Sequence, residues 1–400
     1  MKKIFIFCLL CFTLQAQYFK EVIGTAFEPI QAGALDHADI DGDGDEDVFL
    51  TGYSNTTGTY EVVANLYINN GCGGFTLASG TTFQGVYKGS ALFGDLDLDG
   101  DQDLVISGRT FPNNGAYITK LYINNGLNSG VFTEVSTPLE GVEGRLSLVD
   151  VDGINGPDIF VGGYNGSSFV AKVYLNNGSG SFTLSSSNPF NGKYISAMDF
   201  GDIDGDGDFD FVFTSSSETK FYKNDGLGNF SIFNNPPIKY LGLSTINLED
   251  FDNDGEYDLL ISGVDYSAGY VRTLKLYKND GLGNFNEFYN SFFNGYQQAS
   301  VEICDIDLDG DKDFVISGSV DLRPYRSTWL YLNDGNGTFG KPRLNLLPLA
   351  VTSAANLFFD ANGDGSNDLL LAGYSTKMRR NCISTSSQLT QSILVTHIHG

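Results

Sequence analysis

Apolar and polar residues alternate in short blocks along the chain, and the blocks recur at intervals of about 50 residues. In the second interval the pattern predicts four strands, near residues 90–94, 104–108, 117–124 and 131–135. One of them is the continuous apolar run Leu104-Val-Ile, which is typical of a strand buried on both faces, and Leu369-Leu-Leu is similar. Each repeat is therefore predicted to be all-β.

Two motifs mark the repeats. The first is an acidic nonapeptide before each buried run, and its copies begin at Asp39, Asp95, Asp150, Asp202, Asp250, Asp305 and Asp360. The second is Leu66-Tyr-Ile-Asn-Asn-Gly71 followed by Phe75, which indicates a strand, a tight turn and a returning strand. Repeats of this kind predict a seven-bladed β-propeller of four-stranded blades over residues 17–374.

The ends of the predicted ring also carry a pattern. The sequence Phe-Lys-Glu-Val at residues 19–22 matches the fourth-strand pattern Phe-Thr-Glu-Val at 132–135. We therefore expect the N-terminal strand to complete the seventh blade and close the ring. Residues 375–400 form an atypical Ser/Thr-rich tail, for which a divergent strand, an incomplete seventh blade and a disordered extension all remain open.

The first residues resemble a signal peptide. Lys2 and Lys3 precede an apolar run over residues 4–12, and cleavage is expected between Ala16 and Gln17, which leaves 1–16 as the leader. The run is shorter than the roughly 20 residues that span a bilayer. We expect a protein without a transmembrane segment that is secreted or held at the cell surface or in the periplasm.

The composition argues against a nucleic-acid-binding protein, a disordered chain and a disulfide-rich fold. The 49 acidic and 23 basic residues give a net charge of -26, which opposes binding to nucleic acid. The 41% hydrophobic and 13% aromatic content argues against disorder. The five cysteines, two of them in the leader, do not form a disulfide framework. Most of the acidic residues lie in the nonapeptides, so the acidity is local.

Each nonapeptide has the form of a cation-binding loop. Positions 1, 3, 5 and 9 carry side-chain oxygens, position 7 can offer a backbone carbonyl, and glycine at position 6 permits a sharp turn. Oxygen ligands without His or Cys favour Ca²⁺, with Mg²⁺ a weaker candidate. An EF-hand is excluded, because position 12 is apolar in every copy.

Six copies are predicted Ca²⁺ sites and one is degenerate. In the degenerate copy, with Asp150, Asp152 and Asp158, Ile154 replaces a carboxylate and Asn155 replaces the glycine, so we expect weak binding or none. The ligands of the six predicted sites are Asp39, Asp41, Asp43 and Asp47; Asp95, Asp97, Asp99 and Asp103; Asp202, Asp204, Asp206 and Asp210; Asp250, Asp252, Asp254 and Asp258; Asp305, Asp307, Asp309 and Asp313; and Asp360, Asn362, Asp364 and Asp368.

These motifs carry a family resemblance. The repeated Asp-x-Asp-x-Asp-Gly-x-x-Asp, the Phe93-Gly94 and Phe200-Gly201 pairs before it, and the Asn-Asp-Gly-x-Gly-x-Phe turns resemble FG-GAP/VCBS repeats. The best-known form of these repeats is the seven-bladed head of integrin α subunits. The resemblance implies a calcium-binding propeller. Family members serve in adhesion, in glycan binding or, in some polysaccharide lyases, in catalysis.

No catalytic constellation is found in the sequence. His37 is the single histidine between the leader and the tail, and we expect it to pack beside the first loop. We predict a monomeric, non-catalytic module that binds an extracellular glycan or protein. The alternative is a calcium-dependent polysaccharide lyase, with Arg109, Arg145 or Lys193 as charge partners.

The predicted ligand contacts are aromatic residues in the connections opposite the metal loops. Loops on a rigid scaffold commonly carry binding, and aromatic faces suit sugars or proteins. One set of connections carries the candidates Tyr87, Tyr194, Tyr240 and Tyr296, and the other carries Tyr53, Phe111, Tyr164, Tyr266, Tyr270 and Tyr325.

Overall fold

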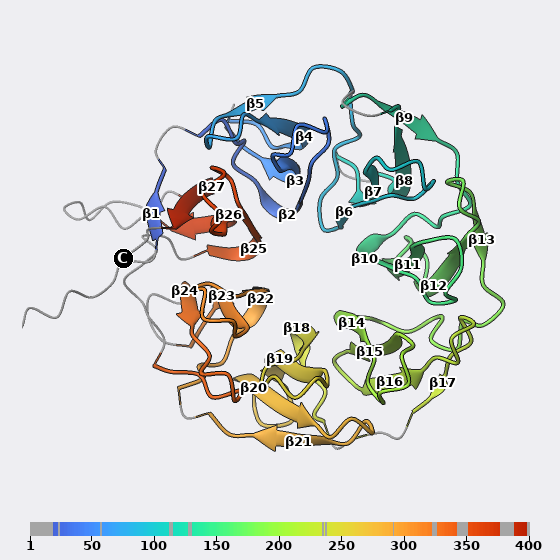
Figure 1. Ribbon diagram of the computed structural model, residues 1–400, viewed down its shortest axis with the longest axis vertical. Helices are drawn as coiled ribbons and strands as arrows, with labels where there is room; N and C mark the ends of the chain where they lie inside the picture. Colours follow the sequence, from blue (N-terminus) through green and yellow to red (C-terminus); the bar gives the residue numbers. More distant parts are fainter. Residues whose placement is uncertain are drawn as a thin grey trace, which may run out of the picture.

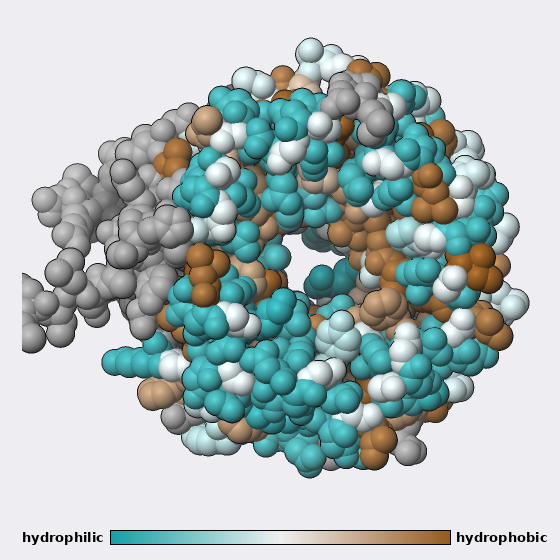
Figure 2. All heavy atoms as spheres, viewed as in Figure 1, coloured by the Kyte–Doolittle hydropathy of each residue, from teal (hydrophilic) through white to brown (hydrophobic). Residues whose placement is uncertain are grey.

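The β-sheets of the protein are arranged in a ring around a central axis (Figure 1). A space-filling view shows an opening through the middle of the ring (Figure 2). The computed structural model describes residues 19–22, 25–56, 58–111, 115–126, 130–233, 236, 238–290, 292–321, 326–341, 351–376 and 388–397. The predicted leader, residues 1–16, lies outside this set. Within it, no helix is long and apolar enough to cross a membrane.

The first five sheets follow one another in chain order. Each is a four-stranded antiparallel meander whose first strand lies nearest the axis (Figure 1). The strands are β2 (Gln31–Ala38), β3 (Asp47–Ser54), β4 (Glu61–Asn69) and β5 (Phe75–Leu77); β6 (Ala91–Gly94), β7 (Asp103–Arg109), β8 (Tyr117–Asn124) and β9 (Phe132–Val135); β10 (Glu143–Val149), β11 (Asp158–Tyr164), β12 (Phe169–Asn176) and β13 (Phe182–Leu184); β14 (Ala197–Gly201), β15 (Asp210–Thr214), β16 (Thr219–Lys223) and β17 (Ser231–Ile232); and β18 (Gly242–Glu249), β19 (Asp258–Asp265), β20 (Val271–Asn279) and β21 (Phe285–Phe288).

The next sheet corrects the predicted blade count. It consists of β22 (Gln297–Cys304), β23 (Asp313–Ser319) and β24 (Arg326–Tyr331), and where the other sheets begin a fourth strand it has only an isolated bridge between Asn333 and Phe339. Gly340 and Pro342 follow Phe339 in the sequence. Glycine and proline both disfavour a strand. Over the described residues the ring has six four-stranded blades, not the seven predicted, together with this three-stranded sheet.

The last sheet joins the two ends of the chain. It contains β25 (Val351–Phe359), β26 (Asp368–Thr376) and β27 (Gln388–His397), and β1 (Phe19–Glu21) pairs with β27, so that Phe19 lies opposite His397. The expectation that the N-terminal strand completes the final blade is confirmed. Strand β27 falls within the Ser/Thr-rich segment 375–400.

The hydrophobic core lies between neighbouring sheets. The first two blades share a cluster that includes Phe49, Leu66, Leu104 and Tyr122, and similar clusters fill the other interfaces. The apolar run Leu104-Val-Ile is fully buried, as its sequence predicts. Burial against both neighbours holds each sheet rigidly in the ring, so the loops at its ends are presented on a fixed scaffold.

Candidate functional site

Each acidic nonapeptide forms the loop between the innermost strand of a sheet and the next strand. In the loop between β2 and β3, the Asp39 carboxylate accepts hydrogen bonds from the backbone N–H groups of Gly42 (2.7 Å), Asp43 (3.1 Å) and Gly44 (3.0 Å). Gly44 has a φ of 94°, a conformation that glycine adopts without strain. Backbone N–H groups of the loop bond the first aspartate in the same way at Asp95, Asp202, Asp250, Asp305 and Asp360.

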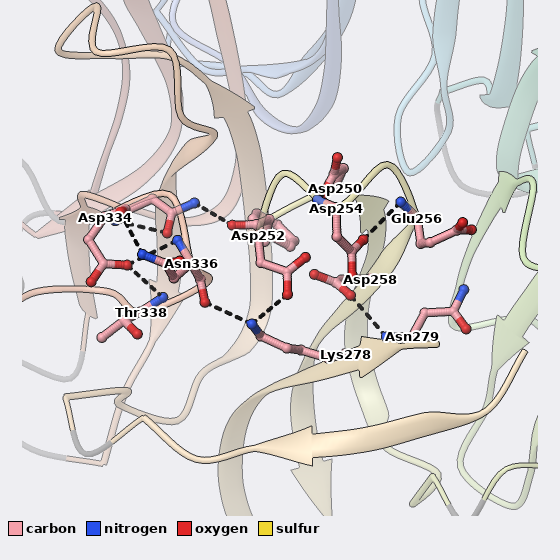
Figure 3. A network of polar contacts seen from close by, with 12 residues as sticks. Asp250, Asp252, Asp254, Glu256, Asp258, Lys278, Asn279, Asp334, Asn336 and Thr338 are labelled. Carbon is pink, nitrogen blue, oxygen red and sulfur yellow. Dashed lines mark hydrogen bonds and ion pairs between the residues drawn. The ribbon is translucent and has the colours of Figure 1, made fainter. Parts of the chain in front are cut away.

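Three carboxylates converge in each of several loops. The converging oxygens lie within 4.8 Å of one another, and Figure 3 shows one such loop, with Asp250, Asp252 and Asp254. The groups include Asp39, Asp41 and Asp43; Asp95, Asp97 and Asp99; Asp150, Asp152 and Asp158; Asp202, Asp204 and Asp206; and Asp250, Asp252 and Asp254. The structure therefore brings together the sequence-predicted ligands of positions 1, 3 and 5.

The degenerate third loop keeps the same overall shape. Asn155 takes the place of the glycine and adopts a φ of 64°, which asparagine tolerates better than most residues. Asp158 joins Asp150 and Asp152 in the carboxylate group, although Ile154 contributes no oxygen ligand. Three carboxylates thus remain available where the sequence predicts weak binding or none.

The second aspartate of the loop indicates that a cation fits there. The Oδ1 atoms of Asp97, Asp204 and Asp252 are buried and have no hydrogen-bond partner among the described residues. A buried oxygen of an ionised carboxylate without a partner is costly. Together with the neighbouring carboxylates it provides the oxygen-only donor set that hard divalent cations prefer. The residues of these loops therefore fit a bound metal ion.

The fourth aspartate has a structural role, because it accepts hydrogen bonds from the backbone of its own sheet. Asp47 is fully buried, its Oδ2 accepts from the N–H of Ile40 (3.0 Å) and its Oδ1 accepts from the N–H of Asn69 (2.8 Å). Burial raises the pKa of Asp47 to about 7, although these hydrogen bonds lower it. The bond to Asn69 places the metal loop and the turn after β4 at the same end of the sheet. Coordination by Asp47 and its counterparts stays a prediction.

The last loop contains the predicted amide ligand. The Nδ2 of Asn362 donates to Oδ2 of Asp368 (3.1 Å), and its Oδ1 accepts from the N–H of Asp364 (3.0 Å). The amide thus occupies the place of the second aspartate and keeps an oxygen inside the loop.

An asparagine at the end of the third strand ties six of the seven loops to the next sheet, and the sequence pattern indicated only a turn-forming role for this residue. Asn224 Nδ2 donates to the backbone carbonyl of Val151 (2.8 Å), which is the second residue of the preceding loop. The same bond recurs from Asn69 to Ala361, Asn124 to Ile40, Asn176 to Leu96, Asn279 to Ile203 and Asn333 to Phe251. The metal loops therefore contribute directly to the contacts between blades.

The opposite end of the sheets carries a run of aromatic side chains. We define the aromatic belt as Tyr53, Tyr60, Tyr87, Phe111, Tyr117, Tyr164, Phe169 and Tyr194. Tyr53 stacks on Tyr87 with ring centroids 4.0 Å apart and meets Phe111 at 5.8 Å. Tyr164 meets Phe169 at 5.4 Å, and Phe169 meets Tyr194 at 5.0 Å.

Arg109 links the two halves of the belt. Its backbone pairs with Tyr87, and its guanidinium lies 5.2 Å from the ring centroid of Tyr117, which in turn meets Tyr164 at 5.6 Å. The belt thus extends from the connections of the first sheet to those before β14. Tyr60, Phe111, Phe169 and Tyr194 are exposed, so the belt presents several aromatic surfaces to solvent.

The four predicted ligand tyrosines differ in exposure. Tyr194 and Tyr240 are 41% and 37% exposed, whereas Tyr87 is 9% exposed beneath Tyr53. Tyr296 is fully buried, because it bridges Thr273 and fills the interface between two sheets, so it offers no surface to a ligand. Of the second set, Tyr266 and Tyr270 meet at 5.1 Å outside the belt, and Tyr325 lies outside the described residues.

The remaining candidates have local partners. His37 lies on β2 beside the first loop, with Nδ1 3.1 Å from Glu46 Oε1 and its ring stacked on Phe359 at 5.7 Å. Arg145 Nε donates to the carbonyl of Ser196 (2.9 Å). Lys193 Nζ lies 2.9 Å from Glu218 Oε1.

Solved structures that are similar to this chain include a lectin, a lyase and a biofilm matrix protein. The chain is 20% identical to an Agrocybe aegerita lectin that recognises non-reducing terminal N-acetylglucosamine, with a TM-score of 0.55 over 79% of this chain and 80% of the lectin. It is 16% identical to the exotype rhamnogalacturonan lyase YesX (TM-score 0.45; 86% and 63% covered) and 12% identical to the V. cholerae biofilm matrix protein Bap1 (TM-score 0.41; 95% and 91% covered). The likeness to the lectin supports the propeller fold.

No curated protein sequence matches the chain. A model of the FG-GAP-like repeat matches residues 39–106, 150–213, 202–261, 250–316 and 305–371. Each matched segment begins at the first aspartate of one metal loop and ends in the buried strand that follows the next metal loop. The loops and the strands that hold them are thus the family's repeated unit, and the chain belongs to the FG-GAP-like repeat proteins.

Proposed function

We propose that this protein is a calcium-binding module that binds glycans through its aromatic belt. The observation that carries the proposal is the belt itself, two groups of neighbouring aromatic rings that Arg109 links at the end of the sheets opposite the metal loops. The sheet β22–β24 counts in this proposal as the remaining blade of a seven-bladed ring.

Calcium is the proposed cation because the loops offer several carboxylates and no nitrogen or sulfur ligand. Bound Ca²⁺ would neutralise carboxylates that repel one another when they converge. The side chains at positions 1, 3 and 5 would hold it, with Asp97, Asp204 and Asp252 contributing the inward oxygens. Because six of the loops also accept a hydrogen bond from the next sheet, the proposed role of the ion is to stiffen the ring.

A glycan is the proposed ligand because sugar rings stack on exposed aromatic faces and bond to nearby polar groups. Phe169 and Tyr194 form such a surface, and Lys193, which pairs with Glu218, immediately precedes Tyr194 in the sequence. The fold likeness to a lectin is compatible with this assignment. We further propose that the module is non-catalytic, monomeric and exported after cleavage near Ala16, as the leader predicts.

The proposal predicts that truncating the belt weakens glycan binding. Phe169→Ala and Tyr194→Ala should each reduce the affinity for a bound glycan about tenfold, because a lost aromatic contact costs about 1–2 kcal/mol. The measurement is a glycan array on the calcium-loaded full chain, followed by titration of each hit. Tyr289→Ala is the matched control, because Tyr289 is highly exposed but lies outside the belt.

The same protein is also assayed for the release of unsaturated products from polyuronates. Glycan binding that depends on Phe169 and Tyr194, without turnover, supports the proposal. Unsaturated product would instead favour a lyase. Glycan binding that the belt variants leave unchanged, or no binding to any glycan, would overturn the assignment of the belt.

A further inference from the structure

The residue before the loop-tying asparagine differs between sheets. Four sheets have an aliphatic residue there: Ile68, Ile123, Leu175 and Leu332. The two neighbouring sheets β14–β17 and β18–β21 have lysine instead, Lys223 and Lys278. Both lysines direct their ammonium groups into the metal loop of their own sheet.

Lys223 Nζ lies 2.7 Å from Asp206 Oδ2 and also contacts Asp204. Lys278 Nζ lies 2.5 Å from Asp252 Oδ2 and donates to the backbone carbonyl of Asn336 at 2.8 Å, in the turn of the next sheet. Figure 3 shows Lys278 between these two partners, beside the carboxylates of its loop. In both loops the lysine therefore engages the second aspartate of the nonapeptide.

The lysine leaves part of each site available. Asp204 and Asp252 each bond lysine through Oδ2, while their Oδ1 atoms stay buried without a hydrogen-bond partner. The three carboxylates of each loop also remain within 4.8 Å of one another. A cation can therefore still bind at the inward oxygens, with the ammonium on the outer side of one ligand.

We propose that Lys223 and Lys278 divide the calcium sites into two affinity classes, with weak sites in the loops at Asp202 and Asp250 and tight sites in the complete loops at Asp39, Asp95 and Asp305, whose sheets have an aliphatic residue at the lysine position. This inference rests on the proposed binding of calcium. A fixed positive charge beside the ligands lowers the negative charge of the loop and repels an incoming divalent cation. The same charge offsets carboxylate repulsion when no ion is bound.

Because of the two affinity classes, the stability of the neighbouring sheets β14–β17 and β18–β21 depends less on calcium than that of the other sheets. Loops without lysine, such as the one at Asp95, need the ion to relieve the repulsion between their carboxylates. The two lysine loops lie in adjacent sheets, so their internal ion pairs hold one side of the ring at calcium concentrations that empty the weak sites. As calcium falls, the weak sites release their ions first.

The test is calorimetric titration of calcium into the chelator-treated full chain. The wild type should show two affinity classes. Lys223→Leu and Lys278→Leu, which install the residue present at Leu175 and Leu332, should each make one weak site about tenfold tighter. Ile123→Lys should make one tight site weaker. Lys275→Leu is the matched control. Lys275 lies on the same strand as Lys278, but it pairs with Glu287, away from the loop.

Terbium luminescence in the same variants gives an independent count of sites that does not rely on heats of binding. Calcium uptake that Lys223→Leu and Lys278→Leu leave unchanged overturns this inference alone. A wild type that takes up no calcium overturns the proposed calcium role together with it. A gain in affinity confined to the two lysine-to-leucine variants supports it.

Discussion

Glu302, on the innermost strand β22, is an acid placed where its charge is unfavourable. Burial, together with the charge of Asp36, raises the pKa of Glu302 to about 8. The folded state therefore binds this proton more tightly than the unfolded state does. The stabilisation is complete below the ordinary pKa of 4.5 and is lost as the pH rises through about 8.

Glu302→Gln should remove this dependence on pH. Glutamine is neutral at every pH, so the variant should match the wild type in free energy of unfolding near pH 4.5, exceed it increasingly up to about pH 8, and keep a constant advantage above that. Urea denaturation at saturating calcium over this range measures the difference. Glu61→Gln, at an exposed position, should show no such trend. A difference that stays constant with pH would contradict the assignment.

The sequence predicted individual residues unevenly. The aspartates of positions 1, 3 and 5 were predictable because their spacing recurs. Tyr296 was not, because a tyrosine in a connection has the same pattern whether it faces solvent or, as here, an interface between sheets. Lys223 and Lys278 carried a readable signal, since they replace an aliphatic residue at a repeated position, but the loop contact depends on side-chain direction.

Pairs of neighbouring sheets are joined by the asparagine bonds as well as by apolar packing. Asn224 is buried, and its Nδ2 donates both to Val151 in the preceding sheet (2.8 Å) and to Phe209 in its own (3.2 Å). Both carbonyls would lose a buried partner if the amide were removed. The bond to Val151 is therefore part of the interface between β10–β13 and β14–β17.

Asn224→Ala should lower the free energy of unfolding by about 1–3 kcal/mol, because buried carbonyls are left unsatisfied. Asn229→Ala, in the exposed part of the same turn, should change it by less than about 0.5 kcal/mol. Chemical denaturation in calcium compares them. Equal effects in the two variants would show that the bond between the sheets contributes nothing.

The strands themselves were largely predictable, because the buried runs and the turns have different patterns. The predicted strand near 117–124 coincides with β8. The limits are instructive. The sequence repeats at Asn333 and Phe339 predicted a full fourth strand, but the ladder there is a single bridge. Strand β27 has no Leu-Tyr-x-Asn motif, and its place is set by pairing with β26 and β1.

For the ring as a whole, removal of calcium should destabilise every blade that depends on its loop. A site filled at ten times its dissociation constant adds about 1.4 kcal/mol, and several sites act together. Chelation of the full chain should therefore lower the melting temperature by about 10 °C or more. Calorimetry with chelator, then with excess Ca²⁺ or Mg²⁺, measures this. An unchanged melting temperature would refute a stabilising metal.

The pairing of β1 with β27 determines when the ring can close. These strands come from opposite ends of the described chain, and the intervening sheets pair only with local partners. Among the described sheets the final one therefore has the highest contact order, and its closure carries the largest loop entropy. During synthesis the earlier blades can assemble in sequence, but the faces flanking the gap stay uncovered until the last strand has left the ribosome.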